Sequence, residues 1–132
     1  MKNIFEKIID NEIPSYKIYE DEEIIAILDI NPLSYGHTLV IPKKRIENFI
    51  NTNEDISYIV KKVQEISCLL KEKIKSDGIT IITNNYYGQD IKHLHFHLIP
   101  RYKGDNFDSS FEHKKIDLEE VYKKLKGGLY ER

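Results

Sequence analysis

The sequence predicts an α+β fold, with a mainly antiparallel five-stranded sheet, one long helix and short terminal helices. Short runs of β-branched and aromatic residues, separated by Pro, Gly and Asn, recur between residues 16 and 101. One long stretch with helical periodicity interrupts them. The 132 residues suit a single domain, 1–132, that can bury a core without disulfides. We expect Cys68, the only cysteine, to be a small core residue.

The first elements are short. Residues 5–10 predict one amphipathic turn, with Phe5, Ile8 and Ile9 on a common side. Two β-like runs at 16–19 and 24–28, joined by an acidic turn, predict a hairpin. A third strand is expected over 37–41, because Gly36 precedes this run and Pro42 closes it.

The long helix is predicted over residues 56–74, where apolar residues follow steps of one, three and four. Asn51 or Thr52 is expected to cap its start, and Gly78 is expected to end it. A fourth strand follows at 79–82, and a fifth at 93–99.

The carboxyl-terminal tail predicts one more short helix, over residues 117–126. Asp117 can cap its start, and glycines after it can stop it. The apolar residues of this helix are expected to point inward, namely Leu118, Val121, Tyr122 and Leu125.

Charge and hydropathy restrict the possible partners. Twenty basic and 22 acidic side chains give a net charge of −2, which argues against a polynucleotide footprint but allows small phosphorylated ligands. The longest uninterrupted apolar run, residues 24–28, is only five residues long. We therefore expect neither a signal peptide nor a membrane segment. We expect a cytoplasmic location.

Three histidines alternate with apolar residues from His93 to Leu98. Successive side chains of a strand point to opposite faces, so His93, His95 and His97 are expected to share one face. A neutral imidazole can attack phosphorus through one nitrogen while a hydrogen bond holds the other. The pattern therefore indicates phosphoryl or nucleotidyl transfer through His95 without a metal, and His97 can stabilise the phosphoryl oxygens.

Two alternatives compete with this interpretation. Histidines at i and i+2 on a strand can bind zinc, and His37, His113 or Asp90 could supply a third ligand. Three histidines in register are, however, more than one zinc ion readily uses. The other alternative is an amphipathic strand whose histidines merely face solvent, which suits one histidine better than three.

Residues 93–99 match, at every position, the signature of the histidine triad family, His-φ-His-φ-His-φ-φ with φ apolar. Segments 4–9, 12–14, 29–32 and 36–44 also resemble family segments, so the resemblance covers most of residues 4–101. It implies a HIT-like fold whose sheet continues across a two-fold homodimer. It also implies a nucleotide hydrolase or transferase that acts on purine nucleotides through a nucleotidyl-histidine intermediate.

The resemblance assigns roles by position. His95 would attack the α-phosphorus, His97 and His37 would contact the α-phosphate, and His93 would support the nucleophile from behind. Asp29 matches the carboxylate that holds the ribose hydroxyls. Phe5, Ile18 and Ile27 match family positions around the base. Asn84 and Gln89 match polar family positions near the phosphates.

The chain departs from the family pattern at a few positions. Asp90 stands where serine or threonine is frequent, and Arg45 replaces a histidine of many relatives. Asn3 and Glu6 lie near the place of a cysteine pair in zinc-bearing members, so we expect no structural zinc and no other cofactor.

The branch of the family stays open. The amino-terminal segment resembles the nucleoside phosphoramidase (Hint) branch, whereas residues 89–105 are also similar to dinucleoside polyphosphate hydrolases of the Fhit branch. Of these two branches, we prefer the nucleoside phosphoramidase branch. A non-enzymatic nucleotide sensor or adaptor is the alternative of another class, and it would need the pocket but not the nucleophile.

Overall fold

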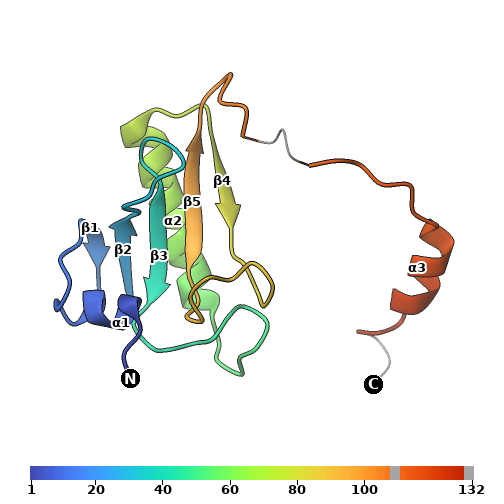
Figure 1. Ribbon diagram of the computed structural model, residues 1–132, viewed down its shortest axis with the longest axis horizontal. Coiled ribbons are helices and arrows are strands. Elements are labelled where there is room, and N and C mark those ends of the chain that lie inside the picture. The colour runs from blue at the N-terminus through green and yellow to red at the C-terminus, as the bar shows by residue number, and fades with distance from the viewer. Residues whose placement is uncertain (108–110, 130–132) are drawn as a thin grey trace.

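The computed structural model describes residues 1–107 and 111–129. Five strands form one sheet in the order β1-β2-β3-β5-β4, and every neighbouring pair is antiparallel (Figure 1). The predicted sheet is therefore confirmed. The strands are β1 (Lys17–Glu20), β2 (Ile24–Leu28), β3 (Thr38–Pro42), β4 (Gly78–Ile82) and β5 (Phe96–Arg101).

Helices α1 and α2 cover opposite faces of the sheet, and each face has its own apolar core. Helix α2 (Ser57–Ile74) lies behind the sheet in Figure 1, and the short α1 (Ile4–Ile9) lies near the amino-terminal strands. The core beneath α2 includes Val63, Leu70, Leu94, Phe96 and Leu98. The core on the α1 face comprises Phe5, Ile8, Ile25, Ile27, Leu39 and Ile41.

Helix α2 begins within one residue of the predicted start, but neither predicted cap residue occupies the N-cap position. Asn51 and Thr52 lie in the preceding loop, where the Thr52 hydroxyl accepts a hydrogen bond from the backbone of Glu54. Ile56 occupies the N-cap position without a side-chain hydrogen bond. The predicted cap was therefore wrong, because a local loop hydrogen bond uses the hydroxyl group that was assigned to the helix.

Helix α2 ends at Ile74, as the periodicity predicts, but Gly78 does not terminate it. Lys75 adopts a left-handed backbone with φ 59° and ends the helix before Gly78. The backbone N–H of Asp77 already donates to the carbonyl of Arg101 at 2.9 Å. Pairing with β5 therefore begins before Gly78, which is the first residue of β4. Cys68 is exposed on α2, outside the buried stripe of this helix, so its predicted core position was wrong.

Helix α3 (Leu118–Leu125) lies far from the sheet (Figure 1). Asp117 caps it by accepting a hydrogen bond from the backbone of Glu120, as predicted. Its apolar residues are nevertheless exposed rather than inward, because the helix does not return to either core. The extent of the single domain, 1–132, stays a prediction. Within the described residues, no helix is long and apolar enough to cross a membrane.

Candidate active site

A cavity of about 430 Å³ lies on the α1 face of the sheet. Its wall is mainly apolar, and its polar groups gather where β3 and β5 meet the preceding loops. The apolar lining includes Ile4, Phe5, Ile8, Ile13, Ile27 and Leu39. The polar lining includes Asp29, His37, Asn84, Asp90, His95 and His97. A largely apolar cavity with a few convergent polar groups is typical of a small-molecule site.

The histidine row approaches this cavity from one side. Strand β5 begins only at Phe96, so His93 and His95 precede it and the predicted strand over 93–99 starts too early. The backbone N–H of Leu94 donates instead to the carbonyl of Ile46 at 2.7 Å, which takes this segment away from the sheet. The predicted alternation persists through the extended segment, since Leu94, Phe96 and Leu98 all enter the core beneath α2.

His95 has the chemistry of a nucleophile. Its Nδ1 lies 2.7 Å from the backbone carbonyl of His93, and a carbonyl can only accept, so Nδ1 carries the proton. The lone pair is then on Nε2. Burial lowers the pKa of His95, so the ring is neutral at neutral pH. The residue is 8% exposed, lines the cavity and packs its ring at 4.8 Å from that of Phe5.

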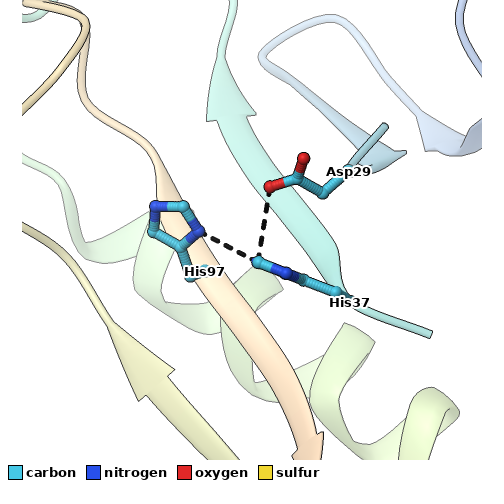
Figure 2. Close-up of side chains that lie close together, drawn as sticks. All are labelled: Asp29, His37 and His97. Carbon is cyan, nitrogen blue, oxygen red and sulfur yellow. Dashed lines mark hydrogen bonds and ion pairs between the residues drawn. The ribbon is translucent and has the colours of Figure 1, made fainter. Parts of the chain in front are cut away.

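His37 and His97 form a second unit of the site. The backbone N–H of Leu33 donates to Nδ1 of His37 at 3.0 Å, so the proton of the neutral His37 ring is on Nε2. This Nε2–H donates to Nδ1 of His97 at 3.0 Å (Figure 2). The proton of His97 is therefore on its Nε2, where it can be donated to a ligand. Burial lowers the pKa of His97 to about 4, and burial also lowers the pKa of His37.

Asp29 joins the loop after β2 to this histidine pair. Its Oδ1 accepts from the backbone N–H of Asn31 at 2.8 Å, in a turn typical of aspartate. Its Oδ2 lies 3.5 Å from Nε2 of His37 (Figure 2). One carboxylate thus shapes the turn and also lines the cavity.

His93 is fully buried behind His95 and does not line the cavity. Its Nε2 lies 2.8 Å from the carbonyl of Pro42, and its Nδ1 lies 3.0 Å from Nδ2 of Asn3. The sequence did not indicate Asn3 as a site residue. The spacing of Asn3 and Glu6 is a capping-box signal for the start of α1, but it says nothing of a contact with residue 93.

The residues expected around the base and the phosphates divide into two groups. Phe5, Ile27 and Asn84 line the cavity. Ile18 and Gln89 are not among the lining residues, so the structure does not place them in this site.

Ile18 and Gln89 have other local surroundings. Ile18 is 37% exposed at a register irregularity of β1, which removes it from the regular pairing with β2. Gln89 uses its amide to brace a loop, since its Nε2 donates to the carbonyl of Glu47 at 2.7 Å. The adjacent Asp90 does line the cavity.

Asp29, His37 and His97 place potential metal-ligand atoms within 4.8 Å of one another. This group differs from the zinc ligands that the sequence suggested, because it contains neither His95 nor Asp90. The third suggested ligand, His113, is exposed in the tail and is not part of the group either. The donor chemistry of the group does not fit a metal. To bind a metal ion, Nε2 of His37 would need a free lone pair. The backbone N–H of Leu33 donates to Nδ1 of the same ring, so the only proton of the neutral ring stays on Nε2.

The HIT domain family model matches residues 10–104, which include all the polar groups of this cavity. An uncharacterized HIT-like protein of Methanocaldococcus jannaschii is 48% identical over 128 residues, covering 94% of this chain and 98% of the relative. The chain belongs to the HIT family. The resemblance seen in the sequence is thereby confirmed.

Solved HIT structures share the fold of this HIT protein. A hypothetical histidine triad nucleotide-binding protein of Sulfolobus tokodaii is 42% identical, with a TM-score of 0.74 over 93% of this chain and 86% of the other. A HIT family hydrolase of Clostridium thermocellum is 38% identical, with a TM-score of 0.69 over 79% of this chain and 95% of the other. The expected HIT-like fold is therefore confirmed.

Proposed function

We propose that this HIT protein hydrolyses purine nucleoside phosphoramidates, or related nucleotide conjugates, at the α-phosphate. The observation that carries the proposal is the unprotonated Nε2 of a buried, neutral His95 beside the cavity. Two similar structures, a hypothetical nucleotide-binding protein and a HIT family hydrolase, support the same class of activity.

The reaction would proceed in two displacements at phosphorus. Nε2 of His95 forms a bond to the α-phosphorus while the bond from phosphorus to the leaving amine breaks, and the amine departs with a proton from solvent. Water then attacks phosphorus, and the bond to His95 breaks. The water oxygen stays on the nucleoside monophosphate, and its protons return to solvent. The Nδ1–H of His95 keeps its contact with the carbonyl of His93, which stabilises the positive charge on the nucleotidylated ring.

The surrounding groups support this assignment of roles. The Nε2–H of His97 can donate to a phosphoryl oxygen, because its Nδ1 is already held by His37. The apolar part of the cavity, which includes Phe5 and Ile27, suits a purine base. Asp29 offers a carboxylate to the ribose hydroxyls from the same cavity.

The charge of the cavity favours a phosphoramidate over a dinucleoside polyphosphate. None of its lining residues, all of which belong to the described part of the chain, is a lysine or an arginine. Two of them, Asp29 and Asp90, are carboxylic acids. A polyphosphate leaving group would bring several negative charges to this place without a cation to meet them, whereas an amine would not.

The test is a side-by-side hydrolysis assay of adenosine 5′-phosphoramidate and diadenosine tetraphosphate, with His95→Ala as the blank. We expect faster release of AMP from the phosphoramidate, with or without EDTA. His113→Ala, an exposed histidine in the tail, is the matched control and should retain full activity. Faster turnover of the dinucleotide would move the protein to the Fhit-like activity. If neither substrate is hydrolysed faster than in the blank while AMP still binds, the protein is a nucleotide sensor.

We also propose that the protein forms a two-fold homodimer in which the sheet continues. Strand β4 supports this proposal, because it lies at one edge of the sheet and its Ile81 is 49% exposed. An apolar edge strand is prone to pair with another chain. Sedimentation equilibrium should give twice the mass of the chain, and Ile81→Lys should shift the protein to the monomer.

A further inference from the structure

Asn3 joins the start of α1 to the first histidine of the row. Its Oδ1 accepts from the backbone N–H of Glu6 at 2.8 Å, and its Nδ2 lies 3.0 Å from Nδ1 of His93. A backbone N–H can only donate, so the amide oxygen must face Glu6 and the NH₂ group must face His93. Nδ1 of His93 is therefore an acceptor.

The other nitrogen of His93 is held as well. Its Nε2 lies 2.8 Å from the carbonyl of Pro42, at the end of β3. A carbonyl can only accept, so Nε2 carries the proton. A neutral imidazole has one proton, and the two contacts together select one tautomer in one orientation. The ring packs edge-on against Phe5, with centroids 5.7 Å apart, which further restricts its rotation.

The backbone of the same histidine orients the nucleophile, since its carbonyl accepts from Nδ1 of His95 at 2.7 Å. We propose that Asn3 is a positioning residue of this enzyme. By donating to Nδ1 of His93, Asn3 holds the His93 ring against the carbonyl of Pro42, and so fixes the backbone carbonyl that orients His95. The kinetic consequence rests on the proposed function, whereas the tautomer of His93 does not.

The charged groups around His93 make this arrangement sensitive to an added charge. Glu6 on α1 and Arg45 after β3 form an ion pair, and Glu6 also accepts from the backbone N–H of Asn3 at 3.0 Å. His95 is the other titratable group beside it. Burial lowers the pKa of His93 and favours its neutral form, while the opposite charges of Glu6 and Arg45 shift this pKa in opposite directions. A carboxylate in place of the Asn3 amide would add a negative charge that protonation of His93 can balance.

Two substitutions separate this role from helix capping. Serine and aspartate are both good N-caps, so Asn3→Ser and Asn3→Asp should preserve the first turn of α1. Asn3→Ser removes the donor to His93 without adding charge. Asn3→Asp places an anionic acceptor opposite Nδ1, which only a doubly protonated His93 can satisfy while it also donates to Pro42. Circular dichroism and thermal unfolding verify that both variants fold.

The first readout is the ¹⁵N shift of the His93 ring between pH 5 and 8. In the unsubstituted protein we expect Nδ1 to be unprotonated at pH 7. Burial lowers the pKa of His93 in the unsubstituted protein, and the carboxylate of Asn3→Asp should raise it, so that the doubly protonated ring persists to higher pH in the variant. Wild-type shifts throughout this range in Asn3→Asp would overturn the proposal.

The second readout is the kinetics of phosphoramidate hydrolysis. Asn3→Ser should show roughly tenfold lower kcat and little change in KM, because the nucleophile is less well oriented while the cavity is intact. Asn3→Asp should keep more of its kcat, because a protonated His93 still contacts residue 3 and Pro42. Unchanged kcat in Asn3→Ser would overturn the positioning role. If the unsubstituted protein hydrolyses neither nucleotide, the proposed function fails, but the nitrogen shifts still decide whether Asn3 selects the tautomer of His93.

Discussion

Nε2 of His37 lies 3.0 Å from Nδ1 of His97, so one ring determines which nitrogen of the other can reach a ligand. His37 immediately precedes β3, and His97 lies on β5, where it pairs with Leu39. The two histidines are 60 residues apart in sequence but adjacent across one antiparallel pair. Because Leu33 holds the far side of His37, the chain of hydrogen bonds has a defined direction that ends at Nε2 of His97.

Burial of neutral histidines should weaken the fold in acid. Burial lowers the pKa of His97 to about 4, whereas the unfolded chain restores its ordinary value of 6.5. Between these values the unfolded state binds more protons, so this residue makes the free energy of unfolding fall as the pH is lowered from 6.5 to about 4. Urea unfolding at pH intervals measures the slope. His97→Gln should reduce the slope, and an identical slope in this variant would contradict the prediction.

Asp29 should discriminate ribonucleotides from deoxyribonucleotides. Asp29→Asn keeps an oxygen for the turn with Asn31 but removes the carboxylate charge. We expect AMP to bind roughly tenfold more weakly, which corresponds to the loss of a hydrogen bond to a charged group, and dAMP to bind nearly unchanged. Isothermal titration calorimetry on both nucleotides tests this. Equal losses for AMP and dAMP would remove the ribose role, and Asp29→Ala should add the cost of the lost turn.

The carboxylate of Asp90 should lower activity toward substrates with negatively charged leaving groups. Its carboxylate lines the cavity that also contains His95 and His97. Asp90→Asn should raise kcat/KM for diadenosine tetraphosphate roughly two- to fivefold, as expected for an exposed charge pair, and leave the phosphoramidate nearly unaffected. High salt should remove the difference. Glu72→Gln, an exposed change on α2, is the control, and a similar gain in it would show a nonspecific charge effect.

Gly36 should be intolerant of any side chain. Its φ is +93°, and an added Cβ would lie 3.2 Å from Cγ of Pro100 and 3.3 Å from Cγ1 of Ile74. Gly36→Ala should lower the free energy of unfolding by roughly 1–3 kcal/mol. It should also lower kcat, because His37 follows directly.

Gly104 provides a matched control for this substitution. Its φ is +84°, but among the described residues no atom beyond its own chain neighbours lies within 4 Å of an added Cβ. Gly104→Ala therefore carries the backbone strain without the crowding, and it should cost about 1 kcal/mol. Denaturant unfolding compares the two variants. Equal losses would show that backbone strain alone, and not the contact with Pro100 and Ile74, makes Gly36 necessary.

Local patterns determined much of the fold. The alternation from Leu94 to Leu98 predicts which side chains enter the core beneath α2, because a polar histidine and an apolar residue cannot exchange faces without a large cost in burial. The apolar repeat of α2 predicts its buried stripe and its extent to within one residue, although not the residues that cap its two ends. The caps depend on loop hydrogen bonds and on pairing with β5, which are not encoded by periodicity.

The sequence by itself determined the family, the sheet and the identity of the histidines at the site. Tertiary structure alone decided the protonation of each ring, because that depends on partners distant in the chain, such as Asn3 for His93. It also decided that Gln89 braces a loop, and that the apolar side of α3 remains exposed. A periodic pattern predicts which side of an element is apolar, but whether that side is covered depends on where the rest of the chain lies.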